Sequence, residues 1–255
     1  MTASKPVLVS IALLCALAWA YLIHLASGMA PAMPAMAGMA MPMVEAWTAA
    51  DFAAMLAMWS VMMAAMMLPA ATPVILLYAR VARQRAAQGR ARPPVPLFVL
   101  GYLLAWSAFS VLATSANWAL HAGGFLSSMM GEAAPRIGGV LLILAGLYQW
   151  TPLKDACLTH CRSPFGFLAD HWRDGPAGAL AMGAHHGAYC IGCCWLLMAL
   201  LFVLGVMNLA WIAVLTVFVL LEKAAPHGRV MSRAAGVLLL AWGAWLVSGV
   251  PFAVP

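Results

Sequence analysis

Sulfur and imidazole side chains gather in one short part of this chain. Five of its six cysteines lie at Cys157, Cys161, Cys190, Cys193 and Cys194. Histidines lie among them, including His186. Thiolates bind soft ions such as Cu(I) and also suit zinc and iron–sulfur clusters, while imidazole suits copper and zinc. This group of side chains therefore predicts a metal site.

The spacing of these residues predicts two helical arms that carry the ligands. His186, Cys190 and Cys193 follow the pattern i, i+4, i+7, so they share one face of a helix. Cys157 and Cys161 are also four residues apart. A tetrahedral zinc or iron–sulfur site would take two cysteines from each arm, whereas two- or three-coordinate Cu(I) needs fewer. The candidate ligands are Cys157, Cys161, His186, Cys190, Cys193 and Cys194.

Two other interpretations of the cysteines stay open. Thiols close together can carry out redox chemistry, and free cysteine is also a small, commonly buried hydrophobe. Cys15 stands alone in an apolar stretch, so packing is its expected role.

A second set of soft ligands is the run of methionines near the N-terminus. Repeated MxxM and MxM spacings place thioethers at Met29, Met33, Met36, Met39, Met41 and Met43. Thioethers prefer Cu(I), and Met33, Met36 and Met39 are the candidate ligands. The alternative is a low-complexity linker of Ala, Met and Pro.

More methionines follow within a predicted helix. Met55, Met58, Met62 and Met66 fall on one stripe of its surface at about 100° per residue. Met62 and Met66 are candidate ligands on a path through the membrane. Methionine is also an adaptable filler of apolar cores, and that interpretation stays open.

The composition assigns the chain to the membrane. Of its 255 residues 65% are hydrophobic and only 8% are charged, against about 25% charged in a soluble domain. We therefore expect an all-α, polytopic bundle in the lipid bilayer. The formal net charge of +6 is explained by topology, since basic residues collect on the cytoplasmic side, so nucleic acid is not an expected partner.

Seven apolar stretches are candidate spans, or six if the first is cleaved as a signal peptide. They are residues 7–26, 53–79, 96–119, 136–152, 186–206, 209–222 and 234–252. With the N-terminus in the cytoplasm and the C-terminus outside, twelve of the thirteen basic residues lie inside, and only Arg136 lies outside. Glu222 and Lys223 are expected to pair locally or to anchor the inner interface.

The whole chain, 1–255, reads as one integral membrane domain with three notable segments. These are a Met-rich extracytoplasmic segment at 27–50, a basic cytoplasmic loop at 80–95, and a cytoplasmic Cys/His segment at 153–185. The motifs GxSxG, HExxH and the P-loop are missing from the sequence, so an enzyme is not favoured.

The stretches MWSVMMAAMMLPAATPVILLYARVAR, YQWTPLKDACLTHCRSPFGFL and HHGAYCIGCCWLLMALL resemble a bacterial family of predicted metal-binding integral membrane proteins. The resemblance covers most of residues 55–245. It implies a metal-linked role in the bacterial inner membrane, with all five clustered cysteines and the methionines before Pro69 as family-typical positions.

Together these observations favour copper(I) handling, as uptake or as delivery to a copper enzyme. Thioethers outside and thiolates inside would give an affinity that rises along the path. A metallochaperone or a copper enzyme is the expected protein partner. The alternatives are a membrane thiol–disulfide oxidoreductase and a membrane protein with a purely structural zinc site.

Overall fold

The computed structural model describes residues 5–29, 47–89, 94–124 and 135–249. Met33, Met36 and Met39, the candidate ligands of the Met-rich segment, lie outside the described residues. Their predicted role is therefore still a prediction.

The described chain is entirely helical outside its turns and connections, which confirms the predicted all-α class. The helices are α1 (Lys5–Met29), α3 (Ala49–Ala87), α4 (Val95–Ala122), α5 (Pro135–Tyr148), α6 (Pro152–Arg162), α7 (Pro164–His171), α8 (Gly175–Ala199), α9 (Leu201–Leu204), α10 (Leu209–Ala224) and α11 (Gly228–Ser248).

Five candidate membrane spans support a multi-pass membrane protein. Among the described residues, α1, α3, α4, α8 with α9, and α11 are long and apolar enough to cross a bilayer. The predicted spans 136–152 and 209–222 instead form α5 and α10, helices of 14 and 16 residues. At 1.5 Å per residue they measure about 21 and 24 Å, less than the roughly 30 Å hydrocarbon core.

Helix α3 is longer than the span predicted for it. It has 39 residues and continues to Ala87, so the first half of the predicted loop at 80–95 is helical. The residues there are mainly Ala, Arg and Gln, which are strong helix formers. The helix begins with a capping box, in which Thr48 and Asp51 each bond the other's backbone N–H.

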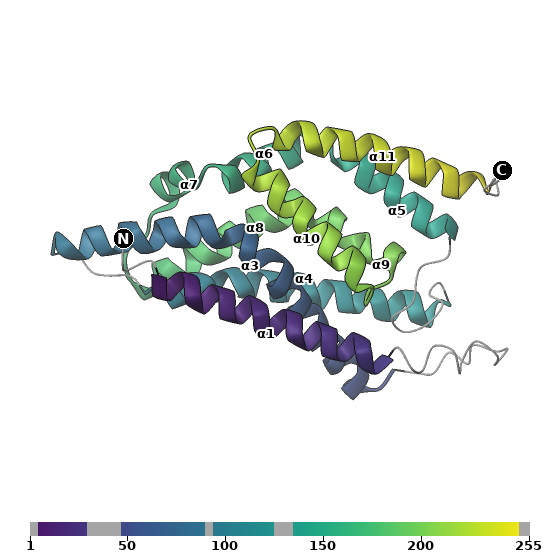
Figure 1. Cartoon of the computed structure of the whole chain (residues 1–255), viewed down its shortest axis with the longest axis horizontal. Helices are drawn as coiled ribbons and strands as arrows, with labels where there is room; N and C mark the ends of the chain where they lie inside the picture. The colour runs from purple at the N-terminus through teal and green to yellow at the C-terminus, as the bar shows by residue number, and fades with distance from the viewer. Residues whose placement is uncertain (1–4, 30–46, 90–93, 125–134, 250–255) are drawn as a thin grey trace.

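Several connections between helices lie toward one end of the bundle. Figure 1 shows the end of α3, the starts of α1, α4 and α8, and the short helix α7 toward this same end. These segments are the ones predicted to share the cytoplasmic face. Which side of the membrane this end occupies stays a prediction from the positive-inside rule.

The closest helix contact in the site region joins α4 to α8. A Cβ atom at Gly183 would lie 1.9 Å from the carbonyl oxygen of Phe98, and one at Gly101 would lie 2.1 Å from that of Leu180. Only glycine permits such an approach of two backbones, as at small-residue contacts in membrane helix pairs. The contact sets Tyr102 of α4 beside the cysteine turn of α8.

Helix α6 carries the first cysteine arm. Its N-cap Thr151 accepts a hydrogen bond from the backbone N–H of Lys154 at 3.2 Å, and Pro152 occupies the first turn. Lys154, Leu158 and Cys161 are its buried residues. Their spacing of i, i+4, i+7 forms one face, and this face turns Cys161 toward the protein interior.

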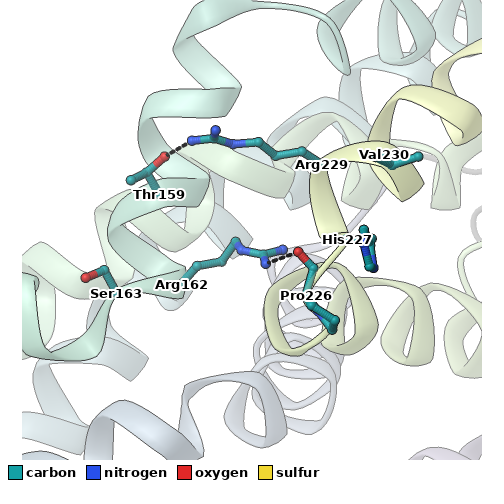
Figure 2. A pocket seen from close by; sticks show the side chains of 7 residues that line it. All are labelled: Thr159, Arg162, Ser163, Pro226, His227, Arg229 and Val230. Carbon is teal, nitrogen blue, oxygen red and sulfur yellow. Dashed lines mark hydrogen bonds between the residues drawn. The ribbon is translucent and has the colours of Figure 1, made fainter.

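Two arginines tie α6 to the connection between α10 and α11 (Figure 2). Arg162 donates to the carbonyl oxygen of Pro226 at 3.0 Å, and Arg229 donates to the hydroxyl of Thr159 at 2.8 Å. The arm that carries the cysteines is therefore fixed against two other elements.

Candidate metal centre

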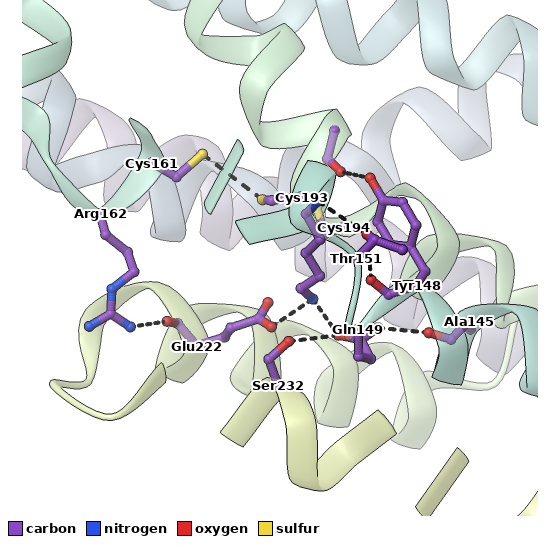
Figure 3. Close-up of polar contacts among 12 residues, drawn as sticks. Ala145, Tyr148, Gln149, Thr151, Cys161, Arg162, Cys193, Cys194, Glu222 and Ser232 are labelled. Atoms are coloured by element: carbon purple, nitrogen blue, oxygen red, sulfur yellow. Dashed lines mark hydrogen bonds and ion pairs between the residues drawn. The ribbon is translucent and has the colours of Figure 1, made fainter. Parts of the chain in front are cut away.

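The two predicted arms meet at a pair of sulfur atoms. The Sγ atoms of Cys161 on α6 and Cys193 on α8 are 3.9 Å apart, and both side chains are buried (Figure 3). Residues 32 positions apart in the chain are thereby brought together. A separation of this size could accommodate one soft ion bound by both sulfurs after small side-chain movements.

The cysteines of α8 form a compact turn of thiols. The thiols of Cys193 and Cys194 both donate to the carbonyl oxygen of Cys190, at 3.1 and 2.9 Å. All three side chains are buried, with at most 1% of their surface exposed. Their thiols are therefore held by the helix backbone and kept from solvent.

Cys190 has two further partners that come from other helices. The ammonium group of Lys223 on α10 donates to its Sγ atom at 2.8 Å, and the hydroxyl of Tyr102 on α4 lies 3.1 Å from the same sulfur. Three helices thus converge on one thiol. A charged donor beside sulfur is a setting that suits anionic thiolate chemistry.

Cys157 lies beside this cluster and less deeply. Its Sγ atom rests on the backbone of α8, so that a Cβ at Gly192 would be only 2.6 Å away. The side chain is half-buried, and burial raises the pKa of its thiol. Hydrogen bonding with Cys190 and Cys193, together with burial, holds the pKa of the Cys161 thiol well above its ordinary value. Both thiols of α6 are therefore harder to deprotonate than a free cysteine, and a metal that bound there would have to displace their protons.

His186, the predicted imidazole ligand, is buried one helical turn before Cys190. Its ring lies among aromatic side chains, 5.0 Å from the ring of Phe167 and 5.8 Å from that of Tyr102. Its Nδ1 atom is buried and has no hydrogen-bond partner among the described residues. An orphaned imidazole nitrogen beside a thiol cluster is a donor available to a metal.

The described residues contain no group of three or more His, Cys, Asp or Glu side chains arranged to hold a metal ion. The four-cysteine site proposed from the spacing is therefore still a prediction. What the structure does bring together is Cys161 with Cys193, and Cys190 with both of its neighbours on the same turn.

The methionines of α3 are buried without exception. These are Met55, Met58, Met62, Met63, Met66 and Met67, each with 1% or less of its surface exposed. The candidate ligands Met62 and Met66 thus lie within the protein, where α3 packs against α1, α4 and α10. Tyr102 joins this helix to the cysteines, because its hydroxyl donates to the carbonyl oxygen of Met67 at 3.1 Å.

The expected local pair of Glu222 and Lys223 is wrong. Adjacent residues on a helix point about 100° apart, so they contact different neighbours. The carboxylate of Glu222 binds the ammonium of Lys154 at 2.6 Å, while Lys223 binds Cys190. No sequence signal specified Lys223 or Tyr102 as members of the site, because both come from helices far away in the chain.

A buried polar network anchors α6, the helix that carries the first cysteine arm. Lys154 and Glu222 are both fully buried, and Lys154 also donates to the side-chain oxygen of Gln149 (Figure 3). Ser232 of α11 donates to that same oxygen at 3.0 Å. The network links α6, α10 and α11, and so it helps to hold α6, which carries Cys161, in position.

A group of rings that the spacing did not predict lies against the middle of α8. His160 stacks on Tyr189 with centroids 4.2 Å apart, and His171 meets His185 at 4.4 Å. The Nδ1 atom of His160 lies 2.9 Å from the carbonyl oxygen of Ala156 in its own helix. On an ideal helix His160 points away from its cysteine neighbours, and here it indeed packs with rings rather than with sulfur.

Comparison with known proteins agrees with this chemistry. The family model described as "PpoB2: Copper chaperone" matches residues 56–246, which include α3 from Leu56 onward and all five clustered cysteines. No curated protein and no solved structure matches the chain. Since the match covers most of the chain, the protein belongs to the PpoB2 copper chaperone family and handles copper.

Proposed function

We propose that the protein holds copper as Cu(I) on the buried thiols of α6 and α8 and delivers it to a copper enzyme. The observation that carries this proposal is the 3.9 Å approach of Cys161 and Cys193, from two helices that are separate in the sequence. Two thiolates are enough for Cu(I), which binds soft sulfur and tolerates low coordination numbers. Cys190 and Cys194 share the same helical turn as Cys193, and with His186 one turn earlier they are the candidates for ligand exchange.

The positive charge of Lys223 also supports Cu(I) binding by the thiol cluster. Two thiolates around one Cu(I) carry a net negative charge, which is costly in an apolar interior unless a cation lies nearby. Lys223 provides that cation 2.8 Å from Cys190. A copper–thiolate complex in this cluster would therefore form beside an existing positive charge.

The proposed route to this site runs along α3. Its buried methionines would pass copper between thioethers from the extracytoplasmic side, where the Met-rich segment would collect it. Tyr102 bonds both Met67 and Cys190, so the inner end of the methionine stripe lies next to the thiol cluster. This direction assumes the predicted topology, with the N-terminus and the cysteine end in the cytoplasm.

The binding step can be tested on the purified full-length protein in detergent. Cu(I) is titrated anaerobically against a chromogenic Cu(I) chelator, for the parent, for Cys161→Ser with Cys193→Ser, and for Cys15→Ser. We expect tight binding in the parent and in Cys15→Ser, and its loss in the double variant. Unchanged affinity in the double variant would remove these thiols from the site.

Delivery and uptake are separated by a second measurement. Protein reconstituted in vesicles is supplied with Cu(I) outside, and a chelator trapped inside reports copper that crosses the bilayer. In parallel, copper-loaded protein is mixed with an apo copper enzyme, and recovery of enzyme activity is followed. Activation without flux supports delivery, and flux without activation supports uptake instead.

The approach of Cys161 and Cys193 also favours one second candidate, thiol–disulfide exchange. A disulfide would need the two sulfurs to move from 3.9 Å to about 2.05 Å. Mass analysis after blocking free thiols distinguishes copper binding by free thiols from a disulfide between Cys161 and Cys193. A protein isolated with this disulfide and without copper affinity would support the redox function, and stoichiometric zinc that copper does not displace would support a structural zinc site.

A further inference from the structure

A basic cavity opens where the end of α6 meets the start of α11. Its volume is about 370 Å³, and Figure 2 shows that side chains from both helices project around it. Its lining includes Thr159, Arg162, Ser163, His227, Arg229 and Val230. The copper site does not use this cavity, although Arg162 directly follows Cys161 in the chain.

The two guanidinium groups at this cavity retain their charge. Arg162 donates to the carbonyl oxygens of Glu222 and Pro226, at 2.8 and 3.0 Å, and Arg229 donates to the hydroxyl of Thr159. These acceptors are neutral, so they orient the guanidinium groups without neutralising them. Each arginine has five N–H donors, and donors are left over for a ligand.

Two carboxylates on α10 and α6, helices next to the cavity, have other partners. Glu222 binds Lys154 at 2.6 Å, and Asp155 lies 3.6 Å from Arg233. None of the described residues that line the cavity is acidic. The cavity therefore combines two arginine charges and two hydroxyls with no negative charge of its own.

The backbone adds to this positive potential. Helix α11 has 21 residues, its N-cap His227 makes no side-chain cap hydrogen bond, and its first turn has no acidic residue. The N-terminus of a helix carries a partial positive charge and presents backbone N–H groups, which together favour anions. This end of α11 lies at the cavity that Arg162 and Arg229 line.

We propose that this cavity binds a phosphate-class anion, supplied by a phospholipid headgroup or by soluble phosphate. Guanidinium groups match phosphate oxygens in pairs, and Arg162 and Arg229 bring two of them to the same cavity. An exposed apolar strip starts at Val230 and continues along α11 at Val237 and Leu238. An acyl chain attached to the phosphate could lie along this strip, which favours the lipid as the source.

A bound phosphate would join α6 to α11 beside the cysteine arm. The proposal is independent of copper, because no thiol lines the cavity among the described residues. Its test therefore uses the full-length protein without copper, purified in a neutral detergent. Phosphatidylglycerol, phosphatidylcholine and inorganic phosphate are the three probes.

Binding is measured by native mass spectrometry for the lipids and by the thermal unfolding midpoint for inorganic phosphate. Arg229→Gln is the main variant, because Arg229 is exposed and its removal breaks only the bond to Thr159. Arg80→Gln on α3 is the matched control, being an exposed arginine outside the cavity. One surface arginine contributes about fivefold to anionic-lipid binding.

We expect Arg229→Gln to retain anionic lipid about fivefold less than Arg80→Gln, and Arg229→Lys to retain part of the affinity. Preference for phosphatidylglycerol over phosphatidylcholine, without a response to inorganic phosphate, identifies the headgroup as the ligand. A phosphate-dependent rise in midpoint that Arg229→Gln abolishes identifies the soluble anion. The proposal is overturned if Arg229→Gln and Arg80→Gln bind all three probes equally.

Discussion

The ammonium group of Lys223 lies 2.8 Å from the Sγ atom of Cys190, where α10 crosses the cysteine turn of α8. Its neighbour Glu222 binds Lys154 of α6 at 2.6 Å. Two adjacent residues of α10 therefore hold both cysteine arms, one through a thiol and the other through an ion pair. Helix α10 has no cysteine, yet it contacts both cysteine arms.

Replacing Lys223 should weaken copper binding without removing a ligand. In Lys223→Met the negative charge of the copper–thiolate complex loses its nearby cation, and we expect Cu(I) affinity to fall about tenfold or more. Lys223→Arg keeps the charge and should retain most of the affinity. Chelator competition measures both variants, and equal affinity in Lys223→Met and the parent would contradict the role of this charge.

Replacing the two cysteines of α6 should change Cu(I) affinity to different extents, although their spacing in the sequence predicted equal roles as ligands. Cys161 is buried and 3.9 Å from Cys193, whereas Cys157 is half-buried with its sulfur on the backbone at Gly192. We expect Cys161→Ser to lower Cu(I) affinity strongly and Cys157→Ser to lower it little. The same competition titration compares them, with Cys15→Ser as control. A larger loss in Cys157→Ser would mean that α6 rotates when copper binds.

Much of this architecture follows from residue patterns in the sequence. The apolar stretches predicted a membrane bundle, and the spacing within each arm predicted which of its ligand side chains share one face of a helix. Such patterns act within one helix, where 3.6 residues per turn determine which side chains share a face. They also explain why the methionines of α3 are buried together.

Contacts between distant helices could not be predicted in the same way. Lys223 and Tyr102 reach Cys190 only because α4 and α10 pack against α8, and a single sequence does not state which helices are neighbours. The local pairing expected for Glu222 failed for the same reason, since its partner Lys154 is 68 positions away in the numbering.

Breaking the buried ion pair should destabilise the protein far more than breaking a surface one. Lys154 and Glu222 are fully buried, so Lys154→Met leaves a carboxylate without its partner, at a cost of about 3–5 kcal/mol. The double variant Lys154→Met with Glu222→Leu removes both charges and should recover much of that loss. Denaturant unfolding in detergent provides the measurement.

The matched control for that experiment is the pair of Arg85 and Asp174. Their side chains are 3.2 Å apart and partly exposed, and a surface pair contributes about 0–1 kcal/mol. We therefore expect Arg85→Gln to change the free energy of unfolding only slightly. A loss in Lys154→Met no larger than in Arg85→Gln would show that the buried network does not support α6.

The α4–α8 contact should tolerate no side chain at Gly183. Alanine is the better helix former by about 1 kcal/mol, but its Cβ would lie 1.9 Å from the carbonyl oxygen of Phe98, which belongs to a helix backbone and cannot move alone. The helices must separate, so we expect Gly183→Ala to be destabilising by about 1–3 kcal/mol. Separation would also move Tyr102 away from Cys190 and weaken Cu(I) binding.

Gly28→Ala is the control, since a Cβ at Gly28 meets nothing within 4 Å, and it should leave both stability and Cu(I) affinity unchanged or slightly raise stability. If Gly183→Ala behaved like Gly28→Ala, the contact between α4 and α8 would not be what holds Tyr102 at the thiol cluster.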